Sequence, residues 1–347
     1  MKVSGKINVW RGKIMRGMMK YIGRNYRMPK PDPNMQIKKI LISRPNSRLG
    51  NQLLIMPIVQ EISAIFPDCK IDLFVRGGLS PILFENYPNI DRIIQLPKKP
   101  FKELLKYLKV WCALRKKKYN IAINVDGNSS SGRLSVQFAR AKWRFFNNYD
   151  EELAARYSDY THIAKFPVYN FRRFLTLLGY KVPEKEIPTL NLRLTDTEIV
   201  HGKKVLDNLV DPAKKTISIY TFATGAKCYS EAWWAEVYDR IKSEFFDKYN
   251  ILEVLPVENV SQIGWKAPTY YSKDLREIGA VIANSALFFG ADSGMMHLAS
   301  ASGAPTIGLF SVTKLTQYEP YGNGSVAIDT NTATIDEMMA QISKNTY

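Results

Sequence analysis

The stretch GADSGMMHLASASGAPTIGLF, residues 290–310, combines a strand, a tight turn, a short helix and a second strand. Its apolar start runs into a turn at Ser293–Gly294, and Gly303 followed by Pro305 marks the end of the helix. The free backbone N–H groups at such a helix start lie over the carboxyl end of the preceding strand, where they favour an anion. Gly294 lets a phosphate approach the backbone closely. The stretch therefore predicts a parallel α/β sheet with a phosphate site at this turn.

The roles of the histidine and the two methionines in this helix are not decided by the pattern alone. His297 lies one turn into the helix, where it is either a structural histidine or a contact to the phosphate. Met295 and Met296 most simply pack in the core.

Strand and helix patterns alternate on both sides of a Pro- and charge-rich passage, YKVPEKEIPTLNLRLTD, at residues 180–196. Such alternation is typical of a parallel sheet covered by helices on both faces. One helix, expected within residues 101–118, places an apolar stripe on one side, made of Phe101, Leu104, Leu105, Leu108, Trp111 and Cys112. We expect an α/β protein with a basic segment at 1–35, a first domain at 36–185, a linker at 186–212, a second domain at 213–330 and a C-terminal helix at 331–347.

The composition narrows the class of protein. The chain has 49 Lys and Arg against 32 Asp and Glu, a net charge of +17, and 46% hydrophobic residues. No run approaches the roughly 20 apolar residues of a membrane span. Three distant cysteines without a CxxC pair indicate neither a zinc site nor a disulfide framework. The basic N-terminus lacks the apolar core of a signal peptide, so we expect a cytoplasmic protein.

More than half of the net charge of +17 lies at the N-terminus, where residues 1–39 hold eleven Lys or Arg and one acidic residue. Residues 7–28 have the pattern of a basic amphipathic helix, which can bind the headgroups of an anionic membrane. Packing on the protein's own core and disorder are the alternatives. The segment lacks a recognisable nucleic-acid-binding fold, so we expect no nucleic-acid partner. Its apolar arc holds Ile7, Trp10, Ile14, Met18, Tyr21 and Ile22, and its basic arc holds Lys13, Arg16, Lys20, Arg24 and Arg27.

Three blocks of the chain resemble glycosyltransferase family 9, the heptosyltransferases of lipopolysaccharide core assembly. Residues 290–310 are similar to the signature D-[ST]-G-x-x-H-L-A-x-x-x-G-x-P-x-x-x-L-F. Residues 42–75, ISRPNSRLGNQLLIMPIVQEISAIFPDCKIDLFV, resemble the family's N-terminal block R-x-x-x-L-G-D-x-L-x-x-x-P. Residues 221–237, TFATGAKCYSEAWWAEV, resemble its middle block, in which Lys227 precedes Trp234 by seven residues. The resemblance runs from about Lys38 to Gly322, with the blocks in the family's order.

The resemblance implies a GT-B fold, two Rossmann-like domains with parallel sheets facing across a cleft. It also implies an inverting, metal-independent transfer of heptose from a nucleotide-diphosphate donor, ADP-heptose, with no cofactor. The acceptor, lipid-linked or a lipopolysaccharide core, would bind the first domain at the inner face of the cytoplasmic membrane. Lys227 would neutralise the charge of the departing phosphate, and Glu258 would hold ribose hydroxyls. The implied donor-site residues are Thr224, Lys227, Glu258, Asp292, Ser293, Gly294, Met295, Met296 and His297, and the implied acceptor-site residues are Arg48, Gly50 and Asn51.

One departure from the family pattern affects the chemistry. The family's L-G-D carries an aspartate proposed to deprotonate the acceptor hydroxyl, whereas this chain has Asn51 there. An amide does not accept a proton at neutral pH. Asp126, which ends a strand of the first domain, is one candidate for the base; alternatively, it only caps a loop. Asn51 would otherwise only orient the acceptor, or the activity would be weak or absent. Two other hypotheses are a non-catalytic or divergent nucleotide-sugar-binding protein of surface-glycan assembly that uses a different sugar, and another GT-B class, since RLGNQ is also similar to a fucosyltransferase motif.

Overall fold

The computed structural model describes residues 21, 23, 31, 32, 34–98, 102–182 and 184–346. The basic amphipathic helix expected at residues 7–28 lies outside the described residues, apart from Tyr21 and Gly23. No helix within the described ranges is long and apolar enough to cross a membrane.

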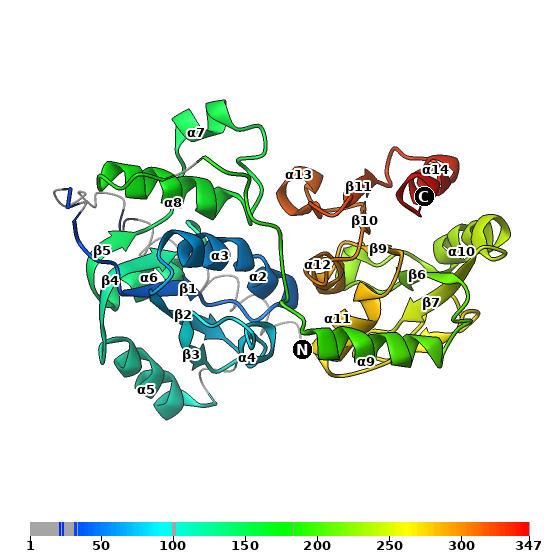
Figure 1. Cartoon of the computed structure of the whole chain (residues 1–347), viewed down its shortest axis with the longest axis horizontal. Helices are drawn as coiled ribbons and strands as arrows, with labels where there is room; N and C mark the ends of the chain where they lie inside the picture. Colours follow the sequence, from blue (N-terminus) through cyan, green and yellow to red (C-terminus); the bar gives the residue numbers. More distant parts are fainter. Residues whose placement is uncertain are drawn as a thin grey trace, which may run out of the picture.

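The first domain is built on a five-stranded parallel sheet with the order β3-β2-β1-β4-β5 (Figure 1). Its inner strands are rich in Ile, Leu and Val because helices cover both faces of the sheet. The strands are β1 (Lys39–Arg44), β2 (Lys70–Arg76), β3 (Ile90–Leu96), β4 (Lys118–Asn124) and β5 (Arg140–Phe145). The helices are α2 (Leu49–Leu53), α3 (Met56–Ile65), α4 (Ser80–Leu83), α5 (Leu104–Leu114), α6 (Ser130–Phe138), α7 (Glu151–Arg156) and α8 (Phe166–Leu177).

The second domain is built on a six-stranded parallel sheet with the order β11-β10-β9-β6-β7-β8. Helices α10 and α14 cover one face, and α11 and α12 cover the other (Figure 1). The strands are β6 (Lys215–Tyr220), β7 (Tyr249–Val254), β8 (Thr269–Tyr270), β9 (Leu287–Ala291), β10 (Thr306–Phe310) and β11 (Val326–Asp329). The helices are α9 (Asp196–Asp207), the 3-10 turn η1 (Gly225–Lys227), α10 (Glu231–Phe245), α11 (Leu275–Ala283), α12 (Gly294–Ala301), α13 (Leu315–Tyr318) and α14 (Ile335–Thr346).

Two parallel α/β sheets, each in its own domain, confirm the predicted fold class. The strand order of each sheet reverses once, between β1 and β4 in the first and between β6 and β9 in the second. In open α/β sheets, ligands bind beyond the carboxyl ends of the strands at such a reversal. The fold therefore offers two positions for a site, one on each domain.

The passage expected as a linker at 186–212 contains a helix. Thr195 and Glu198 form a capping box at the start of α9, and α9 packs on α11 of the second domain. A Cβ at Gly202 would lie 2.4 Å from the carbonyl carbon of Ala280, so glycine permits this close approach. Only residues 184–195 cross between the domains without helix or strand.

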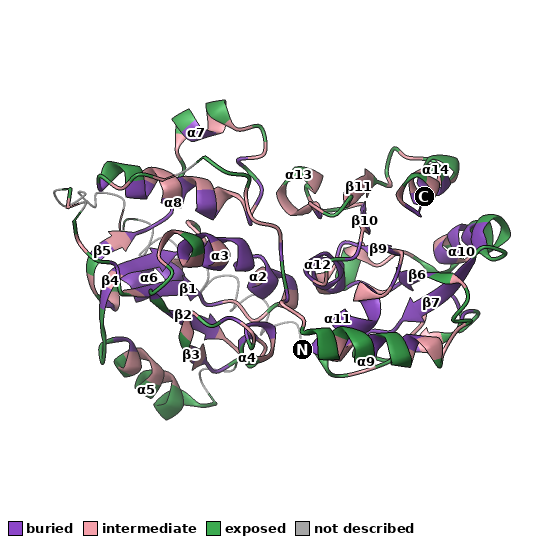
Figure 2. Cartoon of the chain, in the orientation of Figure 1, coloured by how far each residue is buried: buried purple, intermediate pink, exposed green. Residues whose placement is uncertain are grey.

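The predicted apolar stripe on α5 is wrong. Leu104, Leu105 and Leu108 are exposed by 55%, 77% and 52%. Figure 2 shows much of the α5 ribbon in the colour of exposed residues. Of the described stripe residues, Trp111 alone packs on the sheet, and it does so together with Tyr107 and Leu114, which the stripe did not include. Trp111 lies edge-on to Phe74 of β2, with ring centroids 5.4 Å apart.

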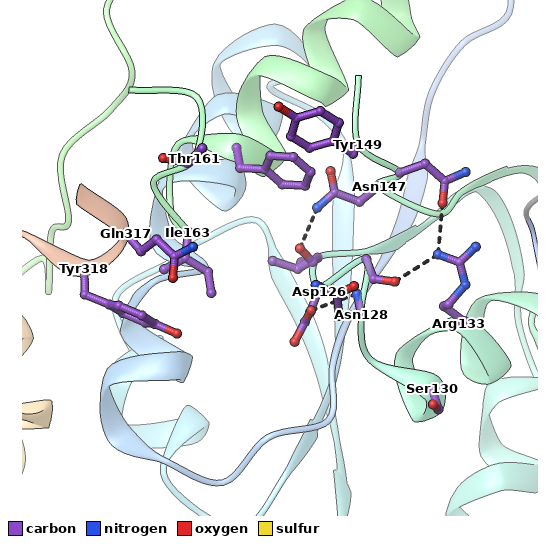
Figure 3. A pocket seen from close by; sticks show the side chains of 14 residues that line it. Asp126, Asn128, Ser130, Arg133, Asn147, Tyr149, Thr161, Ile163, Gln317 and Tyr318 are labelled. Carbon is purple, nitrogen blue, oxygen red and sulfur yellow. Dashed lines mark hydrogen bonds between the residues drawn. The ribbon is translucent and has the colours of Figure 1, made fainter. Parts of the chain in front are cut away.

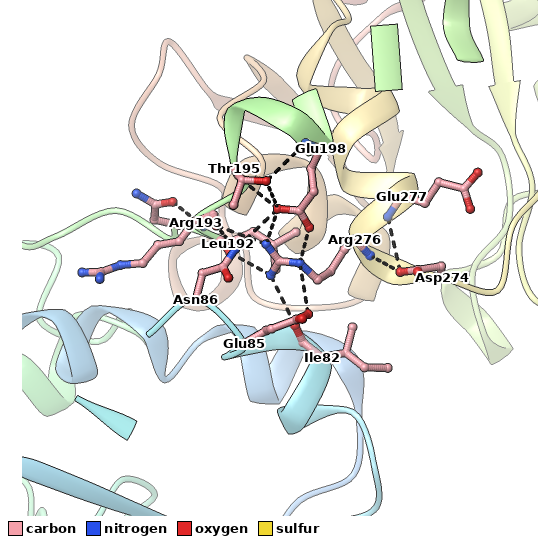
Figure 4. Close-up of polar contacts among 11 residues, drawn as sticks. Ile82, Glu85, Asn86, Leu192, Arg193, Thr195, Glu198, Asp274, Arg276 and Glu277 are labelled. Atoms are coloured by element: carbon pink, nitrogen blue, oxygen red, sulfur yellow. Dashed lines mark hydrogen bonds and ion pairs between the residues drawn. The ribbon is translucent and has the colours of Figure 1, made fainter. Parts of the chain in front are cut away.

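Arg276 of α11 connects the two domains (Figure 4). Its buried guanidinium binds the Glu198 carboxylate with an Nε–Oε1 distance of 2.5 Å. It also donates to the carbonyl oxygens of Leu192 at 3.2 Å and Ile82 at 3.3 Å, the latter in the first domain. The hydrogen bond from Arg276, opposed in part by burial, lowers the pKa of Glu198 to about 2.

We expect the Glu198 carboxylate to make the free energy of unfolding depend on pH in the acidic range. Because its pKa is lower in the folded chain than its ordinary 4.5, the Glu198 contribution is complete above pH 4.5 and is lost as the pH falls toward 2. Allowing for partial exposure, the contribution is about 2 kcal/mol. Urea unfolding between pH 3 and pH 7 should show that Glu198→Gln loses less unfolding free energy at low pH than the wild type does. Glu184→Gln, which alters an exposed ion pair with Arg156, is the control that should keep the wild-type slope.

Candidate functional site

Two groups of polar side chains lie just beyond the strand ends at the two reversal points. Arg44 ends β1, and Asp126 follows β4 by two residues, in the first domain. Lys227 lies in the loop after β6, and Asp292 directly follows β9, in the second domain. Both pairs occupy the place where open α/β sheets bind their ligands.

In the first domain, Arg44 joins two residues that the sequence proposed separately. Its Nη2 donates to Oδ1 of Asn51 at 2.6 Å, and its Nη1 lies 2.9 Å from Oδ2 of Asp126. The Arg44 side chain is 4% exposed, and burial lowers its pKa, although a guanidinium stays charged. The structure therefore brings the amide of Asn51 and the carboxylate of Asp126 to one cation.

The loop after β4 holds Asp126 in place. The other carboxylate oxygen, Oδ1, accepts from the backbone N–H of Asn128 at 3.0 Å. The carbonyl oxygen of Asp126 accepts from the side-chain amide of Asn124 at 2.7 Å. The Asp126 side chain is still 30% exposed, so a ligand can reach it.

Asp126 lines a cavity of about 1010 Å³ (Figure 3). Arg133 of α6 fastens two loops of the wall, since its Nη1 donates to the carbonyl oxygen of Gly127 and to Oδ1 of Asn148. The opposite wall includes Gln317 and Tyr318 of α13, so both domains contribute to the cavity. Arg48, Gly50 and Asn51 are not among its lining residues. The cavity has polar groups on both walls and is large enough for a sugar.

In the second domain, Lys227 lies beside the start of α12. Its ammonium is 2.7 Å from Oδ2 of Asp292, and Thr313 also donates to this oxygen. Asp292 is 5% exposed, whereas the lysine side chain is 34% exposed. Asp292 thus holds the ammonium in place rather than presenting its own carboxylate to a ligand.

The helix that follows Lys227 accounts for its position. Ser230 caps α10 by accepting from the N–H of Trp233. Trp234 is fully buried and lies edge-on to Phe289 of β9, with ring centroids 6.2 Å apart. The tryptophan therefore fixes the start of α10, and with it Lys227, next to the end of β9.

The start of α12 has the predicted geometry. Ser293 is the N-cap, and its Oγ accepts from the N–H of Met296 at 3.4 Å. The N–H groups of Gly294 and Met295 find no acceptor in the described part of the chain. Both methionine side chains are buried in the core, so only the backbone of this turn is available to an anion.

His297 packs between the domains. Burial lowers its pKa well below the usual value, so the imidazole is neutral at neutral pH. A Cβ at Gly50 would lie 2.7 Å from Cδ2 of His297, and a Cβ at Gly294 would lie 2.9 Å from Cβ of Leu49. Gly50 and Gly294 thus allow α2 and α12 to touch, and His297 supplies no positive charge for a phosphate.

We expect Gly50→Ala to destabilise this contact by about 1–3 kcal/mol, the usual cost of overpacking. The buried ring of His297 has little room to move away from a new methyl group. Gly78→Ala is the matched control, because a Cβ there would meet only Oε1 of Gln95 at 3.9 Å. Urea unfolding of both variants measures the effect, and equal stabilities would contradict this role for Gly50.

Two predicted donor-site residues lie apart from these contacts. Thr224 and Glu258 are exposed, and the Glu258 carboxylate forms no hydrogen bond or ion pair with the described residues. Sequence reasoning missed Glu253, a buried carboxylate of β7 whose pKa burial raises. It accepts from Oγ1 of Thr221 at 2.6 Å and from Oγ of Ser261 at 2.7 Å, and so fixes the loop beside Glu258. Its signal was a single charge within the apolar run NILEVL.

Among the described residues, no group of three or more His, Cys, Asp or Glu side chains is arranged to hold a metal ion.

Comparison with known proteins gives consistent matches. The sequence profile of glycosyltransferase family 9 (heptosyltransferase) matches residues 272–346. Lipopolysaccharide heptosyltransferase 3 of Escherichia coli is 23% identical over 300 residues, 80% of this chain and 85% of the relative. Lipooligosaccharide heptosyltransferase 2 of Campylobacter jejuni is 25% identical over 294 residues, 82% of this chain and 84% of the relative.

Solved structures agree on the fold. A family 9 glycosyltransferase from Veillonella parvula gives a TM-score of 0.68 at 18% identity, covering 90% of this chain and 91% of the other. E. coli heptosyltransferase WaaC with ADP gives a TM-score of 0.65 at 18% identity, covering 88% of this chain and 99% of the other. The two facing parallel sheets of this chain are therefore the two domains of a GT-B fold.

Proposed function

We propose that this chain, which belongs to glycosyltransferase family 9 and is a glycosyltransferase, moves heptose from ADP-heptose to a lipopolysaccharide-core or other lipid-linked acceptor. The observation that carries the proposal is the placement of Lys227 by Asp292 beside the start of α12. An ammonium next to free helix N–H groups suits a diphosphate, and a diphosphate is the leaving group of this reaction.

In the proposed reaction, the N–H groups of Gly294 and Met295 bind the diphosphate. Lys227 neutralises the negative charge that grows on the phosphate oxygen as the bond to the sugar breaks. E. coli heptosyltransferase WaaC, which has a similar fold, has been solved with ADP-2-deoxy-2-fluoro heptose, and this complex supports ADP-heptose as the donor here.

Asp126 is proposed as the base that accepts the proton of the acceptor hydroxyl. It lines the cavity to which both domains contribute, and it belongs to the Arg44 cluster that also contains Asn51. Asn51, which occupies the place of the family's aspartate, would orient the acceptor through its amide. Attack from the side opposite the diphosphate inverts the configuration at the sugar carbon.

We also propose that the reaction needs neither metal nor cofactor, because Lys227 and the α12 amides supply the positive charge that the leaving group requires. Equal rates with EDTA and with added Mg²⁺ would support this. A lipid-linked acceptor places the enzyme in the cytoplasm at the inner face of the membrane.

A donor screen tests the proposed function. Thermal shift with ADP, GDP, UDP, CMP and dTDP sugars should single out ADP-heptose, and a ligand at one hundred times its Kd adds about 2.7 kcal/mol. Mass spectrometry of the acceptor should then show one added heptose. Stabilisation by a different sugar nucleotide would favour a divergent donor.

The absence of an acidic residue at position 51 gives a reason to consider a second function, a non-catalytic nucleotide-sugar-binding protein of surface-glycan assembly. Donor binding without product from any acceptor of the panel would favour it.

A further inference from the structure

Helix α5 carries an exposed apolar surface that the proposed active site does not use. We define the α5 leucine patch as Leu104, Leu105 and Leu108 together with Lys106 and Lys109. Leu105, at 77%, is the most exposed large hydrophobic side chain of the described residues, and no other described helix has three such side chains exposed. A folded enzyme rarely leaves neighbouring leucines in water without a partner.

The leucines cannot turn inward. The rotation of α5 is fixed by Trp111, whose ring lies edge-on to Phe74 at 5.4 Å and to Phe138 of α6 at 5.8 Å. The Arg115 guanidinium, at the end of the helix, lies 5.1 Å from the centroid of the Phe138 ring. These contacts hold α5 in one rotation about its axis, so the leucines remain on the surface.

The charged side chains around the leucines are mostly positive. Residues 102–118 contain seven Lys or Arg and one acidic residue, Glu103. Glu103 forms an ion pair with Lys106 at 3.1 Å. The positive side chains are all exposed: Lys102, Lys106, Lys109, Arg115, Lys116, Lys117 and Lys118. Leucines among lysines match the two layers of an anionic bilayer surface, the acyl chains and the phosphates.

We propose that the α5 leucine patch docks this enzyme on an anionic phospholipid surface. The leucines enter the boundary between headgroups and acyl chains, and the lysines contact lipid phosphates. An RNA partner fits less well, because the exposed large hydrophobic side chains of α5 are aliphatic rather than aromatic.

The patch is linked to the acceptor cavity through one helix. Helix α6 packs against α5, and Ser130 and Arg133 in its first turns line the cavity. A chain docked through α5 would keep this cavity near the surface that carries a lipid-linked acceptor. The proposal rests on the proposed function only for this purpose, and not for the surface itself.

The test is co-sedimentation of the full chain with vesicles of 70% phosphatidylcholine and 30% phosphatidylglycerol, and with pure phosphatidylcholine. The wild type should bind the anionic vesicles, and binding should weaken with salt. Leu104→Ser/Leu105→Ser/Leu108→Ser should lower the partition coefficient by about tenfold, and Lys106→Glu/Lys109→Glu by a similar factor. The control, Leu177→Ser/Val200→Ser/Phe246→Ser, removes three apolar side chains elsewhere that are each at least half exposed, and it should bind as the wild type does.

Three results would overturn the proposal. The wild type would not bind anionic vesicles, the triple serine variant would bind them as the wild type does, or the control would lose as much vesicle binding as the patch variant. Self-association in sedimentation velocity, abolished by the serine substitutions in a chain that ignores vesicles, would make the patch a protein interface instead.

A second measurement keeps this proposal separate from the proposed function. Stabilisation of the triple serine variant by ADP-heptose should equal that of the wild type, because the substitutions lie on the outer side of α5. If neither chain responds to ADP-heptose while vesicle binding still depends on the leucines, the donor assignment fails and the docking surface stands.

Discussion

Asp126→Asn is expected to lower kcat/KM for heptose transfer by about 10²- to 10⁴-fold, the usual contribution of a general base. The amide keeps the shape of the carboxylate, so the Asn128 N–H can still donate to it at the position where Oδ1 now accepts at 3.0 Å. It cannot accept a proton at neutral pH. Initial rates with ADP-heptose measure the effect, and donor binding by thermal shift should not change, because Asp126 lies in the first domain.

Asn51→Asp provides the sharper control for this assignment. Arg44 already contacts both positions, so a carboxylate at 51 would face the same guanidinium. Alone, this substitution should preserve or raise the rate. In the Asp126→Asn background it should restore at least about tenfold of the lost activity, because either carboxylate can then serve as base. A collapse of Asn51→Asp to background would show that the amide itself is required, and Asp126→Asn at the wild-type rate would remove Asp126 from the mechanism.

The strand and helix pattern was sufficient to predict the two-domain fold, because strands buried on both faces leave uninterrupted apolar runs such as ILI in β1 and LFFGA in β9. The same pattern located the turn at Ser293, since a capping serine, a following glycine and a later Gly303 are local signals. The proposed roles of Asn51, Asp126 and Lys227 stay predictions.

What the sequence did not provide depends on contacts between distant residues. Arg44 connects Asn51 with Asp126 only because β1 lies next to β4, and strand order cannot be read from one sequence. Glu253 likewise gained its role from Thr221 and Ser261, which lie on other segments. On α5, two apolar arcs compete for the core, and the aromatic arc is buried while the leucines face water. The periodicity of apolar residues identifies an apolar face of a helix, but it does not predict which of two such faces packs on the sheet.

Both clusters hold a functional group by pairing it with an opposite charge. Arg44 is 4% exposed beside a more accessible Asp126, and Asp292 is 5% exposed beside a more accessible Lys227. In each pair the buried residue holds the more exposed residue in place, and the more exposed residue can contact a ligand. The two accessible groups have the charges that the proposed transfer would use, a carboxylate for the acceptor proton and an ammonium for the leaving phosphate.

The second large effect is expected at Lys227. Lys227→Ala should lower kcat by about 10²- to 10³-fold, the range seen when one donor to a developing negative charge is removed. The effect on kcat should exceed that on donor affinity, because the phosphate gains charge only as the sugar departs. Steady-state kinetics separates the two. Asp292→Asn should give a smaller loss, since it leaves the ammonium in place but loosens the contact that now measures 2.7 Å.

Two further variants make this prediction specific. Lys227→Arg keeps the charge on a differently shaped group and should recover part of the rate. Lys266→Ala removes an exposed lysine whose ammonium is 3.9 Å from Asp239 and should act as the wild type does. Trp234→Phe only disturbs the anchor of α10. If the kcat of Lys227→Ala stays within a few-fold of the wild-type value while Trp234→Phe lowers kcat more, then the lysine does not act on the leaving group. The α12 amides would in that case be the main source of positive charge at the phosphate.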